Sequence, residues 1–224
     1  MSASSSPAGT DLESALEVLV DLLPVDCAAA SSLGHPFAVE TLAVTTMLAA
    51  TLDETQIDLG QGPAWEAFGT RRPVVLQCDD SDDRRRWPFV EAALSRHGIA
   101  TATALPLRFG ALDIGAVSLY SRLPVRFRPE QTALAEELTL VVAHRLIARM
   151  TDDGDRADPL LSRRDIHTAA ITLSRLTRLS PADALLAMRA RAFTAGVSVR
   201  DVAADLNTGR LALARDLGLL DGLR

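Results

Sequence analysis

Two apolar runs separated by a short turn constrain the fold of this 224-residue chain more than any other feature. Residues 101 to 107 read TATALPL, residues 113 to 120 read DIGAVSLY, and the segment RFGA lies between them. Short apolar runs on either side of a glycine-containing turn are typical of a β-hairpin. The sequence therefore predicts two neighbouring antiparallel strands, and the fold must contain a sheet that accommodates them.

The rest of the first 150 residues alternates between strand-like and helical patterns. Strand-like segments precede the hairpin at residues 25–33, 38–46 and 73–77. Helical patterns cover residues 11–23, 47–56, 65–69, where Gly69 is expected to end the helix, and 131–150, which follow Pro129 and Glu130. Hairpin-paired strands with helices at both ends indicate an α+β fold, in which helices cover an antiparallel sheet.

The distribution of charge divides the chain into two parts. The first 161 residues contain 13 arginines and 23 acidic residues, a net charge of −10, whereas residues 162–224 contain ten arginines and six aspartates, a net charge of +4. The segment TDDGDRADP at residues 151–159 places glycine and proline between acids, which is typical of a linker. We therefore predict a disordered lead at 1–10, a domain at 11–150, a linker at 151–161 and a second domain at 162–224. An acidic domain joined to a basic one is the asymmetry expected when only the second meets a polyanion.

The second domain contains three predicted helices with clear boundaries. The first covers residues 162–178, SRRDIHTAAITLSRLTR. Ser180 is expected to cap the second helix, with Pro181 at its first position, and Gly196 to end it. Ser198 and Asp201 have the spacing of a capping box that begins the third helix. Three short helices in about fifty residues predict a small all-α bundle.

The residue content argues against several kinds of catalysis. All 23 basic residues are arginine, so the lysine of a P-loop, of a protein kinase and of a Schiff-base enzyme is missing. The four histidines and two cysteines have neither metal-ligand nor catalytic-triad spacing. We therefore expect a protein that is not an enzyme, without metal, cofactor or disulfide framework. No membrane span or secretory signal is visible, and we expect a cytoplasmic protein.

Three consecutive arginines, Arg84 to Arg86, precede Trp87 and look at first like a nucleic-acid contact. They follow QCDDSDD, whose four aspartates cancel the local charge. We interpret this basic cluster as part of a surface loop after a strand, and not as an RNA contact.

The first domain resembles GAF domains of the actinobacterial type. The segments GQGPAWEAF, RRPVVLQ, RRRWPFVEAA, HGIATATALPLRF and DIGAVSLYSRLPVRFRPEQTALAEEL carry the resemblance, which covers residues 11–148. It implies a GAF-type antiparallel sheet that senses a small molecule or mediates dimerisation, with a homodimer as the expected assembly. Trp65 and Trp87 are the candidates for lining a ligand pocket. Ala64 stands where such domains often carry cysteine.

The second domain resembles the ANTAR domain without a gap over residues 163–206, through the segments RRDI, LSPADALLAMRARA and VSVRDVAADL. ANTAR domains are three-helix modules of transcription antitermination regulators that bind RNA stem-loops. On a helical wheel of about 100° per residue, Arg164, Arg175 and Arg178 fall on one side of the first helix, away from its apolar stripe. The predicted RNA contacts are Arg163, Arg164, His167, Arg175, Arg178, Arg191 and Arg200. Ala170 and Ile171 stand where the family usually has Lys-Gly, and Ile171 falls among the arginines.

Two other functions fit the same residues. Residues 198–206, the turn NTG and RLALARDLG have the spacing of a DNA-binding helix-turn-helix, although the last segment has few base-reading side chains. Alternatively, the first domain forms a dimer or binds a partner protein, and the RNA module is vestigial.

Overall fold

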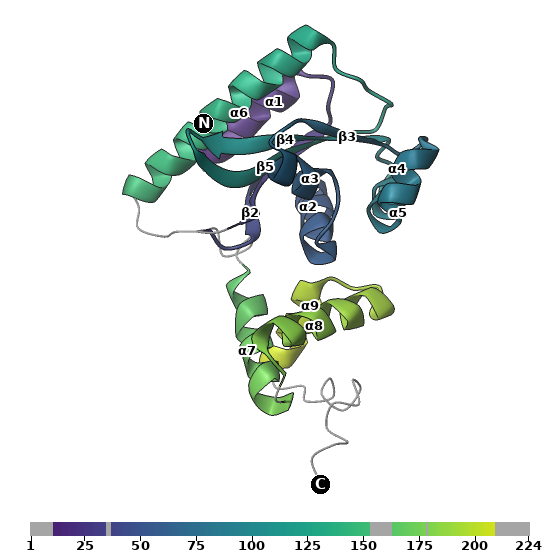
Figure 1. Cartoon of the computed structure of the whole chain (residues 1–224), viewed down its shortest axis with the longest axis vertical. Helices are drawn as coiled ribbons and strands as arrows, with labels where there is room; N and C mark the ends of the chain where they lie inside the picture. The colour runs from purple at the N-terminus through teal and green to yellow at the C-terminus, as the bar shows by residue number, and fades with distance from the viewer. Residues whose placement is uncertain (1–10, 35–36, 153–162, 178, 209–224) are drawn as a thin grey trace, which may run out of the picture. The chain divides into compact units, whose positions relative to one another are not determined.

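The computed structural model describes residues 11–34, 37–152, 163–177 and 179–208 (Figure 1). The chain divides into two compact units, Met1–Leu161 and Ser162–Arg224, called unit 1 and unit 2 below. The predicted disordered lead at 1–10 lies outside the described residues. So does the predicted linker from residue 153 on, while its first two residues, Thr151 and Asp152, belong to a helix.

Unit 1 is built on one five-stranded sheet. Its strands are β1 (Cys27–Ser32), β2 (Glu40–Val44), β3 (Val74–Gln77), β4 (Thr101–Phe109) and β5 (Leu112–Ser121). Their order across the sheet is β2-β1-β5-β4-β3, and every neighbouring pair is antiparallel. The α+β fold and the antiparallel sheet predicted from the sequence are confirmed.

The predicted hairpin is the central pair β4–β5, and its strands are longer than the sequence pattern indicated. Phe109 pairs with Leu112, so only two residues form the turn. Gly110, the first of them, has a φ of 59°, a left-handed conformation that glycine adopts without steric cost. The strands therefore extend into the segment RFGA that the sequence assigned to the turn.

Helices cover both faces of this sheet (Figure 1). Helices α1 (Asp11–Leu22) and α6 (Pro129–Asp152) lie on one face, and α2 (Met47–Leu59), α3 (Pro63–Thr70), α4 (Ser81–Arg86) and α5 (Pro88–Arg96) lie on the other. Successive side chains of a strand point to opposite faces. Accordingly Ala28 and Ala30 of β1 join the core under α1 and α6, while Cys27 and Ala29 join the opposite core.

The ends of α3 and α4 differ from the sequence predictions. Gly69 lies within α3, and the helix ends at Thr70. Its C-cap is Arg71, whose φ is 58° and whose backbone N–H donates to the carbonyl of Ala67. Arg84 to Arg86 form the last turn of helix α4, so the prediction of a surface loop was wrong for this segment. Asp80 caps α4 by accepting a hydrogen bond from the N–H of Asp82, which explains why an acid-rich segment begins a helix here.

Unit 2 contains helices α7 (Arg164–Thr177), α8 (Pro181–Ala195) and α9 (Val199–Asn207). The predicted caps are present. The hydroxyl of Ser180 accepts from the N–H of Asp183, Gly196 ends α8 with a φ of 65°, and Ser198 and Asp201 form a reciprocal capping box. The three helices share one apolar core, formed by Ile166, Ala169, Ala170, Leu173, Ala184, Met188, Ala192, Val199, Val202, Ala203 and Leu206.

Candidate functional site

The interior between the sheet and α2 contains a buried carboxylate. Asp53 of α2 is fully buried and accepts hydrogen bonds from two hydroxyls, one on β1 and one on β2. The Ser31 hydroxyl lies 3.2 Å from Asp53 Oδ1, and the Thr41 hydroxyl lies 2.7 Å from Oδ2. A buried acid is tolerated only where such donors satisfy it. Asp53 therefore fastens α2 to β1 and β2 through polar groups.

One turn further along α2, Gln56 joins three parts of the fold. Its side-chain amide donates to the Tyr120 hydroxyl at 3.0 Å, and its side-chain oxygen accepts from the backbone N–H of Ala64 at 2.9 Å. Its backbone carbonyl accepts from the indole N–H of Trp65 at 2.8 Å. Burial is the largest cause that raises the pKa of Tyr120 well above its ordinary value, so this hydroxyl stays protonated. Hydrogen bonds of Gln56 thus hold the start of α3 to α2, and the same side chain bonds to Tyr120 of β5.

The two tryptophans that the sequence proposed as pocket residues have structural contacts. Trp65 is half-buried, and its ring nitrogen is engaged by Gln56 as described. Trp87 is 5% exposed and packs in the apolar core beneath α4 and α5. The Arg86 guanidinium lies over the Trp87 ring, 4.5 Å from its centroid, which is a cation–π contact. The structure therefore places Trp87 in the core.

A surface hollow of about 510 Å³ lies elsewhere in unit 1. Gln77, Asp79, Asp80, Pro124 and Arg126 line it, and neither tryptophan contributes. It is polar and open, unlike the mostly apolar, enclosed clefts in which small ligands are usually held.

Both cysteines are buried in the core on the α2 side of the sheet. Burial is the main cause that raises the pKa of each thiol above its ordinary value of 9.0. Because the thiolate is the reactive form, both thiols are poor nucleophiles at neutral pH. In the described part of the chain, no three His, Cys, Asp or Glu side chains are grouped as metal ligands.

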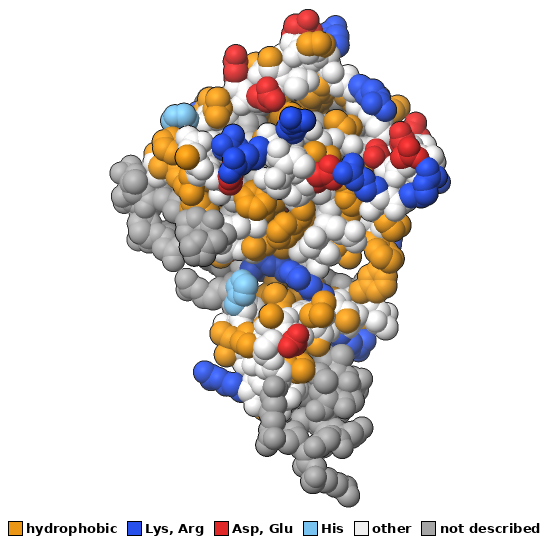
Figure 2. All heavy atoms as spheres, in the orientation of Figure 1, with side chains coloured by type: hydrophobic (Ala, Val, Ile, Leu, Met, Phe, Trp, Pro, Cys, Tyr) orange, Lys and Arg blue, Asp and Glu red, His pale blue; other side chains and the backbone are white. Residues whose placement is uncertain are grey.

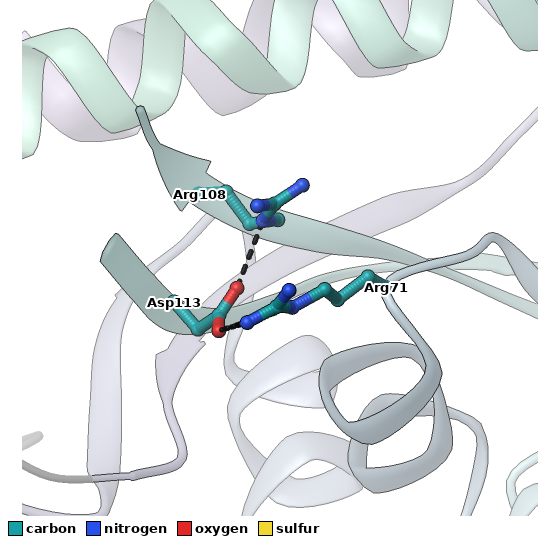
Figure 3. Close-up of polar contacts among 3 residues, drawn as sticks. All are labelled: Arg71, Arg108 and Asp113. Carbon is teal, nitrogen blue, oxygen red and sulfur yellow. Dashed lines mark hydrogen bonds and ion pairs between the residues drawn. The ribbon is translucent and has the colours of Figure 1, made fainter. Parts of the chain in front are cut away.

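A charged cluster links α3 to the tip of the hairpin (Figure 3). Arg71 and Arg108 both point toward Asp113, which sits at the start of β5. Arg71 Nη2 lies 2.6 Å from Asp113 Oδ2, and Arg108 Nε lies 2.8 Å from Oδ1. The Arg71 hydrogen bond, followed by that of Arg108, holds the pKa of Asp113 below its ordinary value of 3.8.

Replacing Asp113 with asparagine should destabilise unit 1 by about 1 kcal/mol near neutral pH, because a partly exposed carboxylate with two arginine partners is removed. A lowered pKa means that the stabilisation is present above the ordinary carboxyl pKa and is lost as the pH falls through the lower folded value. Urea unfolding of both proteins at a series of pH values measures this. The two curves should converge in acid, and a gap that widens there would contradict the assignment. Asp82→Asn, which removes an exposed pair with Arg85, is the control.

The predicted RNA contacts in unit 2 differ in accessibility. His167 and Arg175 are exposed on α7, and Arg191 and Arg200 are half-buried. Arg164 begins α7, but its side chain and all of Arg178 lie outside the described residues.

The remaining predicted contact, Arg163, is only 3% exposed. This burial is at odds with its prediction as a direct RNA contact, because solvent does not reach the guanidinium. The sequence carries no signal for its burial.

Apolar side chains also reach the surface of unit 2, and only some of them were expected from the sequence. Ile171 is 45% exposed, as its place on the helical wheel predicted, while its neighbour Ala170 is buried in the three-helix core. On α8, Leu186 and Phe193 are 63% and 62% exposed. They are seven positions apart and so lie on the same side of the helix, opposite the buried Met188.

The five-stranded antiparallel sheet between two helical layers defines unit 1 as a small α+β domain. Residues 10–146 match the family model described as GAF domain. Because the match covers more than half of the chain, the protein belongs to the GAF domain family. GAF domains typically sense ligands or mediate dimerisation in signalling proteins.

Several solved structures are similar to unit 1 at low sequence identity. A domain from Sinorhizobium meliloti 1021, assigned to a two-component sensor histidine kinase, is 19% identical with a TM-score of 0.50, and the match covers 66% of this chain and 96% of that one. The GAF domain of a two-component sensor histidine kinase from Bacillus halodurans is 13% identical with a TM-score of 0.48, covering 64% and 98%. The GAF domain/HD domain protein from Geobacter sulfurreducens is 16% identical with a TM-score of 0.47, covering 66% and 100%.

A comparison with curated proteins found no match. Among the helices of the described ranges, none has the length and apolar character needed to cross a bilayer.

Proposed function

We propose that this chain is an RNA-binding transcription antitermination regulator. In this proposal unit 2 is an ANTAR domain that binds RNA stem-loops, and the GAF domain senses a small molecule or mediates dimerisation. A signal at the GAF domain changes how two copies of unit 2 are presented in a homodimer, so that two stem-loops are held together. The chain acts in the cytoplasm by binding, without catalysis.

The observation that carries the proposal is the concentration of positive charge on a small helical unit. Residues 162–224 have a net charge of +4 in a chain whose other part has −10. His167 and Arg175 are exposed on α7, away from the buried stripe of Ile166, Ala169 and Leu173. A basic face on a short helix can bind the phosphates of folded RNA. The caps at Ser180 and Ser198 fall where the resemblance to ANTAR domains expects them.

One observation favours the alternative of a GAF-mediated dimer with a vestigial RNA module. Ile171 is 45% exposed among the positions assigned to RNA, and an apolar side chain there contributes no charge. The other alternative, a DNA-binding helix-turn-helix, depends on the segment RLALARDLG at residues 210–218, which lies outside the described residues.

The interior of unit 1 also bears on how the GAF domain acts. The polar groups of Asp53, Gln56 and Tyr120 bond one another or nearby strand residues. A ligand entering between α2 and the sheet would have to replace these bonds with equivalent donors and acceptors.

The full chain should bind a hairpin RNA at least about tenfold more tightly than a DNA duplex of the same length, since A-form shape and loops distinguish the two. Fluorescence anisotropy with labelled oligonucleotides, repeated over a range of salt concentrations, measures both affinities. The logarithm of the RNA affinity should fall linearly with the logarithm of the salt concentration. Equal affinity for the RNA and the DNA, or no binding to either, would reject the proposal.

A further inference from the structure

Helix α6 has an exposed stripe along the side that faces away from the sheet. Its inner side is buried against the sheet through Ala135, Val142, Ala143 and Leu146. On its outer side Leu140 is 51% exposed and Val141 41% exposed. The whole stripe is Ala133, Glu137, Leu140, Val141, His144 and Ala148. In Figure 2 hydrophobic side chains and a histidine gather along the upper left flank, where Figure 1 shows α6.

The stripe is symmetric about its midpoint between Leu140 and Val141. Glu137 and His144 are equally far from that midpoint, and so are Ala133 and Ala148. All six positions fall within about 100° of the helix circumference, so they share one side. Along the stripe the side chains are, in order, small, acidic, apolar, apolar, basic and small. If the direction of the helix is reversed, the acid takes the position of the histidine and the histidine that of the acid.

This arrangement makes the surface complementary to itself under a twofold axis. If two α6 helices pack antiparallel about the midpoint, Leu140 and Val141 meet their own copies at the axis. Glu137 then lies opposite His144 of the partner subunit, twice in the interface. A parallel pairing would instead place each Glu137 beside its own copy, where like charges destabilise. Self-complementarity of one patch is what a twofold interface requires.

The position of His144 suits this contact. Its Nδ1 lies 2.7 Å from the carbonyl oxygen of Leu140, and since a carbonyl can only accept, Nδ1 carries the proton. The Phe109 ring packs against the imidazole in a T-shaped arrangement, with the ring centroids 5.0 Å apart. Nε2 is therefore the nitrogen that is left to meet another molecule, and it donates to a carboxylate in the imidazolium form, in which both ring nitrogens carry a proton.

We propose that two copies of this chain associate through α6 in antiparallel orientation, about a twofold axis between Leu140 and Val141. The partner is a second copy of the chain because the charges and the apolar pair complement themselves. The exposed Val18 and Leu22 of α1, which packs beside α6, extend the apolar surface of the same layer. The inference rests on the homodimer proposed above and adds its surface and direction.

Cysteine cross-linking tests the direction. Native Cys27 and Cys78 are buried with raised thiol pKa values, so the background is low. Glu137→Cys protein labelled with ¹⁵N and unlabelled His144→Cys protein are mixed, diluted, reconcentrated and oxidised, and the products are separated by mass. We expect the mixed dimer to exceed either self-linked dimer at least about fivefold, because only that pair lies across the antiparallel interface. Arg96→Cys on α5, an exposed position away from α6, is the control.

The results separate this inference from the homodimer itself. A chain that light scattering finds monomeric at every concentration overturns both. A dimer in which Glu137→Cys links mainly to itself overturns only the antiparallel arrangement.

A second pair of variants tests the surface. Leu140→Glu places two carboxylates at the axis and should weaken the dimer at least about tenfold, because both charges are forced into an apolar contact. Val18→Glu makes the same change on α1 and should have a smaller effect. The reverse order of effects, measured by concentration-dependent scattering, would move the interface to α1.

Discussion

Replacing Gly115 with alanine should destabilise unit 1 by about 3 kcal/mol, the largest effect we expect of any single methyl group in this chain. Gly115 lies in β5 and pairs with Ser32 of β1. A Cβ at this position would lie 1.8 Å from the carbonyl oxygen of Ser31, which belongs to the backbone. Because a backbone atom cannot rotate away, β1 and β5 would have to separate and lose hydrogen bonds. The expected fall in Tm is about 10 °C.

The intrinsic fluorescence of tryptophan measures this change in unit 1 alone, because both tryptophans of the chain, Trp65 and Trp87, are in that unit. Gly69→Ala is the matched control. A Cβ there meets nothing within 4 Å, and the residue lies inside α3. Alanine is the better helix former by about 1 kcal/mol, so this variant should be slightly more stable than the native protein. Equal melting of the two variants would contradict the close approach of β1 and β5.

The sequence was sufficient where the determinants of structure are local. The β4–β5 hairpin was predicted because its two strands are separated by only a turn, with Gly110 at a position that requires a positive φ. Helices α8 and α9 were predicted because Ser180, Gly196 and Ser198 mark their ends by hydrogen bonds within three or four residues. Local bonds of this kind leave a pattern in the sequence.

The sequence was insufficient where the contacts join distant residues. Asp53 is satisfied by Ser31 and Thr41, which are 22 and 12 positions away and have no common motif. The contact between Arg71 and Asp113 spans 42 positions. The burial of Trp87 depends on how α4 and α5 close over the sheet, and composition alone could not distinguish a core ring from a pocket ring. The hydrogen bonds and packing inside the GAF domain could therefore not be predicted from the sequence.

The same limit applies to the proposed RNA face. Helical periodicity placed Arg175 and Ile171 on the outer side of α7, and both are exposed. It could not indicate that Arg163, one residue before the helix begins, is buried. Helical periodicity predicts exposure only for residues within the helix. The exposure of the residues that precede the helix depends on tertiary contacts.

Removing two arginines from α7 should weaken RNA binding by about 2 kcal/mol, a factor of about 30 in Kd. The variant is Arg164→Ala/Arg175→Ala. These positions are eleven residues apart, so their Cα atoms lie on the same side of the helix, about 17 Å apart along it. Each arginine that neutralises a phosphate releases counterions, so the slope of log affinity against log salt should become shallower by about 1.4 to 1.8. Anisotropy titrations of the full chain with a hairpin RNA measure both quantities.

The control variant Arg85→Ala/Arg96→Ala removes two exposed arginines from unit 1, including one of the conspicuous cluster before Trp87. It changes the net charge by the same amount and should leave RNA affinity within about twofold, since these arginines belong to unit 1 and exposed charges are screened by salt. Ile171→Arg is the opposite change, because it adds a positive charge to α7. It replaces a 45% exposed apolar side chain on the same side as Arg175 and should tighten binding about fivefold. If the two double variants weaken binding equally, the interaction depends on net charge, and α7 is not the RNA-binding face.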